Sequence, residues 1–165
     1  MKMNESSERA GVAVRGSCDG LPARLVALLG DENVLTDGTS RRFHAQDVYG
    51  SGMLPLVVVR PGSMEELAAA VQLVTAAGGA VVARGGGMSY TDGYLPIREN
   101  TVTFDTTRLD RILEINPRDR YVTVECGVTW KALADALAPH ALRTPYWGPL
   151  SGLRATVGGA LSQGS

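Results

Sequence analysis

The chain has 165 residues, of which 44% are hydrophobic and 20% are charged, and its formal net charge is −1. A chain of this length buries roughly 70% of its unfolded surface on folding, which favours a single globular domain. The 16 basic and 17 acidic residues leave no basic excess, so nucleic acid and anionic membranes are not expected as partners.

The sequence also limits the compartment and the chemistry of its cysteines. No apolar run approaches the ~20 residues that span a bilayer, and no apolar segment of a signal peptide follows the polar N-terminus. Cys18 and Cys126 lack the spacing of a metal or redox site. We therefore expect a cytoplasmic protein with two free thiols and no metal.

Residues 1–53 are predicted to form an N-terminal leader with a short helix. Residues 1–18 show no periodic pattern. Pro22 suits the first turn of a helix, and Gly30 marks its end. Residues 31–53 are predicted to be rich in loops. The apolar face of the helix is predicted to hold Leu21, Leu25 and Leu28.

Residues 54–60, LPLVVVR, form an apolar run that is typical of a strand covered on both faces. Ser63 and Glu66 have the spacing of a capping box at the start of a helix, and glycines 78–79 end it. AVVA at 80–83 predicts the next strand, so this segment is interpreted as a parallel βαβ unit. The stripe predicted to be buried on the helix consists of Met64, Leu67, Ala68, Val71 and Val74.

The rest of the pattern predicts an α+β fold, in which the βαβ unit precedes an antiparallel hairpin and a helix. TVTF at 101–104 predicts a third strand, and 111–126 predict a hairpin whose turn contains Pro117. Thr129 caps a helix that Pro139 ends. The last stretch of the chain, which is rich in glycine and serine, shows little helical periodicity.

A run of three glycines, in ARGGGMSY, directly follows the second strand of the βαβ unit. Three familiar glycine motifs fail here or further on. The G-x-G-x-x-G fingerprint would need glycine at Tyr90, the Walker A loop would need lysine at Ser165, and the hydrolase elbow would need glycine at Ala160. A nucleotide or nucleophile site of these three kinds is therefore excluded.

Consecutive glycines also suit a turn whose backbone N–H groups converge on an anion. Arg84 would add positive charge to such a turn, and Ser89 would add a hydroxyl donor. A tight turn without a ligand is the alternative for RGGG alone. A second segment of small residues, 155–165, and the position at the carboxyl end of a strand both favour a ligand.

Four blocks in the same order resemble the FAD-binding domain of the vanillyl-alcohol oxidase / p-cresol methylhydroxylase flavoprotein family: RPGSMEELAAAVQLV, RGGGMSY, VECGVTWKALADAL and TVGGALSQGS. The resemblance covers residues 54–165, which we take as an FAD-binding PCMH-type domain. In that family the glycine loop wraps the FAD pyrophosphate, and the T-V-G-G segment passes close to the flavin. The implied FAD-binding residues are Gly85, Gly86, Gly87, Met88, Ser89 and Tyr90, with Arg84 beside them, and Thr156, Val157, Gly158, Gly159 and Ser162.

Two departures from the family pattern carry expectations of their own. Members that tether FAD through this loop have histidine directly after the glycines, where this chain has Met88. A thioether has no ring nitrogen to attack the flavin, so the resemblance implies dissociable FAD. The chain also ends inside the second motif, so we expect an N-terminal fragment that lacks the C-terminal part of the domain.

The resemblance implies an oxidoreductase that transfers a hydride from a small organic substrate to FAD, with oxygen or another electron acceptor. The alternatives are a non-catalytic FAD- or nucleotide-binding subunit beside a partner chain, and a phosphate-binding module without redox function. We identify no catalytic acid–base pair: Asp92 and Glu125 have no evident partner, and His140 is expected at the surface. His44 receives no function. Residues 144–148 (TPYWG) are interpreted as a turn, with an approach to the flavin as the alternative.

Overall fold

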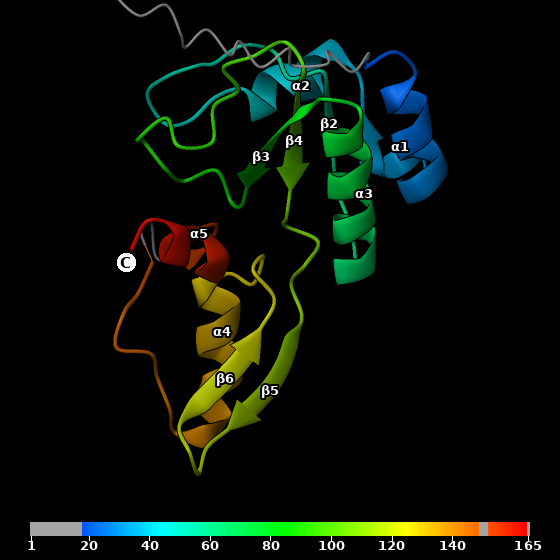
Figure 1. The fold of residues 1–165 in the computed structure, drawn as a ribbon. Helices are drawn as coiled ribbons and strands as arrows, with labels where there is room; N and C mark the ends of the chain where they lie inside the picture. The colour runs from blue at the N-terminus through cyan, green and yellow to red at the C-terminus, as the bar shows by residue number, and fades with distance from the viewer. Residues whose placement is uncertain (1–17, 149–151, 165) are drawn as a thin grey trace, which may run out of the picture.

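The computed structural model describes residues 18–148 and 152–164, so residues 1–17 of the predicted leader lie outside it. The described chain forms two lobes joined between β4 and β5 (Figure 1). The elements of the first lobe are α1 (Leu21–Leu29), the 3-10 helix η1 (Asp31–Asn33), β1 (Val34–Leu35), α2 (Gly38–His44), β2 (Val57–Val59), α3 (Met64–Ala76), β3 (Ala80–Arg84) and β4 (Thr101–Asp105). Those of the second are β5 (Ile112–Asn116), β6 (Tyr121–Val124), α4 (Trp130–Leu137), the 3-10 helix η2 (Ala138–His140) and α5 (Val157–Ser162).

The first lobe contains a four-stranded sheet with the strand order β1-β2-β4-β3. Strands β2 and β3 both pair with β4 in parallel, and β1 pairs with β2 antiparallel. The predicted parallel βαβ unit is therefore present as β2-α3-β3, but β4 lies between its two strands. Because the three parallel strands point the same way, β3 and β4 end at the same edge, which faces the second lobe (Figure 1).

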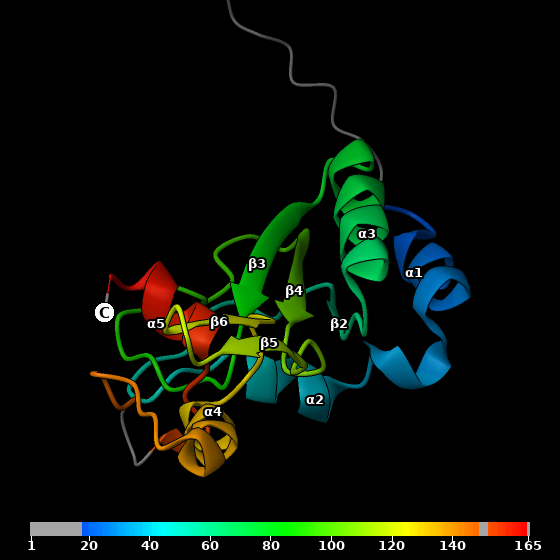
Figure 2. The same cartoon turned by 90° about the horizontal axis from the view of Figure 1, so that it is seen from below.

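The core of the first lobe lies between this sheet and the pair of helices α1 and α3, which lie side by side in both views (Figures 1 and 2). Residues ahead of the predicted domain boundary at 53/54 contribute to this core through α1 and β1, and the boundary itself stays a prediction. The buried residues of this cluster are Leu21, Leu25, Leu29, Val34, Val57, Val59, Ala70, Val74, Ala77, Val102 and Phe104.

The predicted helix faces were wrong in part. On α3 the side chains of Met64 and Ala68 are exposed, whereas Ala70 and Val74 are buried. The capping box that starts α3 is formed by Ser63, which accepts a hydrogen bond from the Glu66 backbone N–H at 3.1 Å. A cap fixes where a helix starts, but the sheet and α1 together decide which side it buries. On α1, Leu28 is exposed in the same way and Leu29 is buried.

Two short helices were also missed. The loop-rich interpretation of 31–53 is wrong for α2, whose N-cap Asp37 accepts hydrogen bonds from the backbone N–H groups of Thr39 and Ser40. The last stretch contains α5, which Thr156 caps through the Gly159 N–H at 3.2 Å. Both helices have seven residues or fewer. That length is too short for a periodic pattern to show in the sequence.

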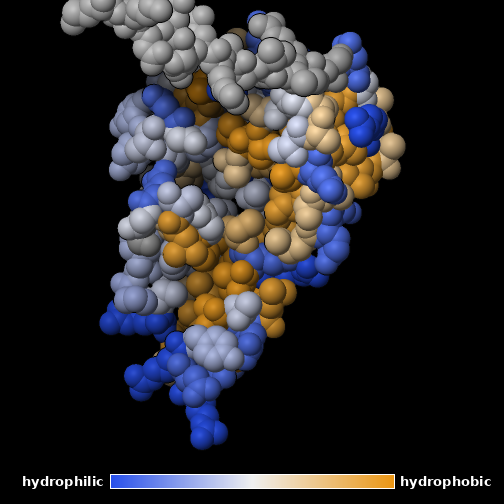
Figure 3. Space-filling view, in the orientation of Figure 1, coloured by the Kyte–Doolittle hydropathy of each residue, from blue (hydrophilic) through white to orange (hydrophobic). Residues whose placement is uncertain are grey.

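The second lobe is built from the predicted hairpin and helix. Strands β5 and β6 pair antiparallel, and α4 begins where expected, with Thr129 accepting from the Ala132 N–H at 3.2 Å. Val128, Leu133 and Leu137 form the buried centre of this lobe. In the view of Figure 3 hydrophobic surface covers parts of both lobes and their junction. Among the described helices, none has the length and apolar character needed to cross a membrane.

Candidate functional site

The glycine loop leaves the sheet at the edge where β3 and β4 end. Arg84 closes β3 and pairs in register with Asp105, the last residue of β4. Thr106, the residue after Asp105, holds the start of the loop, because its N–H donates to the Arg84 carbonyl oxygen at 2.9 Å. The loop 85–90 therefore starts from a fixed point on the sheet, on the side that faces α5 (Figure 1).

The glycines let this loop cross the segment that precedes α5 at very short range. A Cβ on Gly86 would overlap the carbonyl oxygen of Arg154, and one on Gly85 would overlap the hydroxyl of Thr156. Gly87 has a φ of +69°, a conformation that side chains disfavour. The segment that approaches the three glycines so closely is thus part of the same chain, around Arg154 and Thr156.

The segment before α5 is in turn fixed to the second lobe by backbone hydrogen bonds. The Trp130 N–H donates to the Ala155 carbonyl at 3.1 Å, and the Val157 N–H donates to the Val128 carbonyl at 2.8 Å. Gly158 packs so closely on Cys126 that an added Cβ would lie 2.6 Å from the Cys126 Cβ. Cys126 therefore has the packing role expected of a small residue. The glycine loop and this segment tie the two lobes together.

A cleft of about 610 Å³ opens between the glycine loop and α5. Its size is within the range of small-molecule and cofactor sites. Nine of the twelve predicted FAD-binding residues line it: Gly85, Gly86, Gly87, Met88, Ser89, Tyr90, Thr156, Gly159 and Ser162. The other three lie outside its lining: Arg84 is buried beneath the loop, Gly158 packs on Cys126, and Val157 packs on the core of the second lobe.

The described residues that line the cleft carry no charge and offer both polar and apolar surface. A hydrogen bond of 2.5 Å from the Gln163 side-chain amide to the Ser89 hydroxyl links the two walls. Ser89 also shares a hydrogen bond of 2.9 Å with the Thr91 hydroxyl. A ligand here would meet hydroxyls, amides and glycine backbone.

Aromatic side chains also line the cleft, and sequence reasoning missed most of them. Tyr146 and Trp147 line it, although a turn was the preferred interpretation of TPYWG over an approach to the flavin. The ring of Tyr146 meets that of Trp130 edge to face at 5.1 Å, which fixes it from behind. Trp147 and Tyr90 remain largely exposed. The exposed aromatic pair in a glycine-rich stretch was the available sequence signal, since such rings suit a planar ligand.

Arg84 is a buried cation below the glycine loop, with only 5% of its surface exposed. Its guanidinium lies over the rings of Phe43 and Tyr94, at 4.9 and 5.3 Å from their centroids. Within the described chain its Nε atom has no hydrogen-bond partner. Burial lowers the pKa of Arg84 from its ordinary value. Arg84 also lines a smaller cavity of about 340 Å³ on the other side of the glycine backbone.

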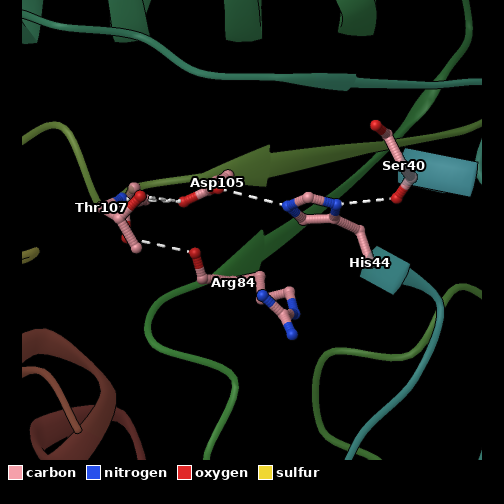
Figure 4. A network of polar contacts seen from close by, with 6 residues as sticks. Ser40, His44, Arg84, Asp105 and Thr107 are labelled. Atoms are coloured by element: carbon pink, nitrogen blue, oxygen red, sulfur yellow. Dashed lines mark hydrogen bonds and ion pairs between the residues drawn. The ribbon is translucent and has the colours of Figure 1, made fainter. Parts of the chain in front are cut away.

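A second polar network, shown in Figure 4, was not predicted. His44 is buried at the end of α2, and its Nε2 lies 3.2 Å from Asp105 Oδ2. Asp105 Oδ1 accepts hydrogen bonds from the Thr107 N–H at 2.9 Å and the Thr107 hydroxyl at 2.6 Å. Burial would raise the pKa of Asp105, but hydrogen bonds from His44 and Thr107 outweigh it and lower this pKa. The sequence gives no signal for this pair, since 61 positions separate its members.

Glu125 has a partner, but the pair is not placed for catalysis. The buried carboxylate accepts from the Arg111 side chain at 2.6 and 3.0 Å and from the Arg111 backbone N–H at 2.8 Å. The hydrogen bonds from Arg111 lower the pKa of Glu125. This pair joins the open end of the β5–β6 hairpin, where β5 starts and β6 ends, and neither residue lines the cleft. Asp92 likewise contacts the 47–50 loop, with its N–H donating to Asp47 at 3.1 Å.

Comparison with known proteins identifies the family. The model of the FAD binding domain matches residues 55–165, and the chain belongs to this family, as the sequence resemblance predicted. The glycolate oxidase subunit GlcD of Escherichia coli K12 is 35% identical over 111 residues, which cover 66% of this chain and 21% of that protein. A D-lactate dehydrogenase of Archaeoglobus fulgidus is 35% identical over 107 residues, covering 64% of this chain and 23% of that protein.

The fold agrees with this assignment. The structure of p-cresol methylhydroxylase with substrate bound matches with a TM-score of 0.74 and 21% identity, over 87% of this chain and 28% of that one. The predicted α+β class with a βαβ unit and a hairpin is thus confirmed. The chain spans less than a third of the length of these similar proteins. What it shares with these flavin oxidoreductases is their FAD-binding domain.

Proposed function

We propose that this chain binds FAD without a covalent bond in the cleft between the glycine loop and α5. We further propose that the complete protein is a flavin-dependent oxidoreductase. The observation that carries the proposal is the cleft itself, which is formed by the two segments that the family resemblance assigned to FAD. Residues 55–165 match the FAD binding domain. When bound, FAD supplies the hydride-accepting chemistry, and the protein binds and orients it.

The residues of the cleft fit the chemistry of FAD. Backbone N–H groups of a glycine loop suit a pyrophosphate, and the Ser89 hydroxyl lies on the same wall. The rings of Tyr90, Tyr146 and Trp147 offer flat apolar faces to a planar heterocycle. Neutral donors and aromatic faces together match a cofactor with an anionic centre and planar ends.

Met88 lines the cleft at the position where tethering members of the family carry histidine. Its thioether sulfur has no proton to lose and no ring nitrogen, so it cannot form the covalent flavin bond made by an imidazole. We therefore propose that the chain holds FAD only through non-covalent contacts.

The substrate of the complete protein is proposed from its relatives. Glycolate and D-lactate, which two relatives are named for, are both small 2-hydroxy acids. We propose this class as substrate, with oxidation by hydride transfer to FAD and with oxygen or another acceptor taking the electrons. The second candidate is a non-catalytic FAD-binding subunit that acts beside a partner chain. It is favoured by the absence of a charged acid–base pair from the described cleft lining and by a relative that is itself named a subunit.

Titration of the purified chain with FAD tests the proposal through the quenching of flavin fluorescence. We expect saturable binding of one FAD per chain, with competition by ADP, which shares the pyrophosphate and adenosine. Trp147→Ala removes an aromatic face from the cleft and is expected to weaken FAD binding by about tenfold, equivalent to about 1.4 kcal/mol. Tyr121→Ala, an exposed ring on β6 outside the cleft lining, is the matched control and is expected to bind normally. Absence of saturable binding would contradict the proposal.

A further inference from the structure

His44 has an unusual environment, because an oxygen atom lies next to each ring nitrogen. Nδ1 is 2.8 Å from the Ser40 backbone carbonyl oxygen, which can only accept, so Nδ1 carries a proton. Nε2 is 3.2 Å from Asp105 Oδ2. An unprotonated Nε2 would place its lone pair against a carboxylate oxygen in a buried site, which is unfavourable. The contacts of the ring therefore call for an imidazolium beside an ionised Asp105.

Asp105 connects this ring to the root of the glycine loop (Figure 4). Its other oxygen holds the Thr107 N–H and hydroxyl, which fixes the turn after β4. Within that turn Thr106 donates its N–H to the Arg84 carbonyl at 2.9 Å and its hydroxyl to the same atom at 3.3 Å. The Arg84 carbonyl belongs to the peptide that leads into Gly85. A chain of short contacts thus runs from His44 to the first residue of the loop.

Phe43, the residue before His44, also contacts Arg84, from which the glycine loop starts. Phe43 packs its ring on the Arg84 guanidinium at 4.9 Å, and it meets the His44 ring edge to face at 5.2 Å. The last turn of α2 therefore contacts both the side chain of Arg84 and, through Asp105, its carbonyl. The loop that starts at Arg84 has no direct contact with the His44 ring among the hydrogen bonds of the described chain.

We propose that His44 is a positioning residue, whose protonated ring holds Asp105 and thereby sets the direction of the glycine loop toward FAD. This inference rests on the proposed FAD site and adds a dependence on protonation to it. When the pH rises far enough to remove the Nε2 proton, two acceptors face each other at 3.2 Å. Asp105 then loses its contact, the turn that holds Arg84 loosens, and the loop no longer matches the pyrophosphate.

Other charges surround the pair and act on its proton. Arg84 interacts electrostatically with Asp105 and favours the carboxylate. The remaining charged groups are Arg41 and Arg42 on α2 itself, and Asp110 and Arg154, which line the small cavity together with Asp105. Arg41 already donates its Nε–H to the Pro55 carbonyl oxygen at 2.7 Å. The arginine side chains disfavour the protonated form of the His44 ring, whereas the carboxylates of Asp105 and Asp110 favour it.

The first experiment follows the ring and the loop by nuclear magnetic resonance in the chain without FAD, from about pH 5 to about pH 10, which spans the ordinary range of histidine. As the His44 ring loses its Nε2 proton, the amide resonances of Gly85, Gly86 and Gly87 are expected to shift in the same step. His44→Gln removes the titrating ring, so the glycine resonances lose this step. His140→Gln, at the other histidine, which is exposed, is the matched control and keeps it.

Asp105→Asn provides a variant that keeps the contacts without the charges. An asparagine amide can donate to an unprotonated Nε2 while its oxygen accepts from Thr107, so a neutral ring fits this site. We expect a folded variant in which His44 is neutral and the glycine resonances no longer follow pH. A His44 ring that is already neutral in the unmodified chain near pH 5, or glycine resonances that ignore its titration, would overturn the inference.

The second experiment measures FAD affinity against pH by flavin fluorescence. We expect the unmodified chain to bind more weakly through the same pH step. His44→Gln is expected to bind about tenfold more weakly than the unmodified chain with its His44 ring protonated, equivalent to about 1.4 kcal/mol, and without that step, whereas His140→Gln binds as the unmodified chain does. If none of these chains binds FAD, the proposed function fails, and the resonance experiment still decides whether His44 positions the loop. If FAD binds with equal affinity to all of them, the positioning role fails alone.

Discussion

The substitution Gly86→Ala tests how the triple glycine works. The added Cβ would overlap the carbonyl oxygen of Arg154, and this oxygen belongs to backbone that hydrogen bonds fix to the second lobe. The neighbour is not the flexible end of a side chain, so the two segments must separate. Overpacking of this kind costs about 1–3 kcal/mol. At about 2–4 °C per kcal/mol for a chain of this size, we expect the melting temperature to fall by about 2–12 °C.

The same separation changes the cleft, because Gly86 and Thr156 line its opposite walls. We expect FAD affinity to fall by at least about tenfold, or about 1.4 kcal/mol, in protein that is still folded. Gly38→Ala is the matched control. An added Cβ there meets its nearest atom, the end of Arg42, at an ordinary 3.4 Å, and the residue lies at the start of α2. The melting temperature and the FAD affinity, from fluorescence titration, are measured for both variants and for the unmodified chain. A Gly86→Ala protein that melts and binds FAD like the unmodified chain would refute the crossing as the reason for the glycine.

Three further outcomes are expected. Acid precipitation of the FAD-loaded chain should leave all flavin in the supernatant, since Met88 cannot tether it; yellow protein in the pellet would contradict this. Because the pKa of Asp105 is lowered in the folded protein, its carboxylate adds stability that is present above the ordinary value of about 3.9 and is lost as the pH falls below it. In urea unfolding, the free energy of unfolding of Asp105→Asn should therefore fall less on acidification than that of the unmodified chain. An equal fall in both proteins would contradict the stabilising role of the carboxylate. With excess FAD and a dye as electron acceptor, these 165 residues should not turn over 2-hydroxy acids. Hydride transfer needs a substrate that is held near the flavin with water excluded. Repeated cycles in which a 2-hydroxy acid bleaches the flavin and the dye reoxidises it would contradict this expectation.

The sequence determined the features that depend on neighbouring residues. The caps at Ser63 and Thr129 fixed the starts of α3 and α4, because an N-cap bonds to backbone within one turn. The β-branched runs placed β2 and β4, and the Asn116–Asp119 turn placed the hairpin. The four family blocks also identified the two segments that form the cleft. All of these signals are local, or are spaced along the chain in a fixed order.

The tertiary structure alone decided which distant residues meet. A helical pattern allows several faces to be buried, and only packing against α1 and the sheet selected Ala70 and exposed Met64 on α3. The pairing of His44 with Asp105 depends on how α2 docks on the end of β4, which no spacing encodes. The triple glycine left a tight turn and a ligand contact as alternatives. The folded chain shows a third reason for the glycines, which is the close approach of the Arg154 backbone. The sequence could not show it, because the crossing of two segments depends on their arrangement in space.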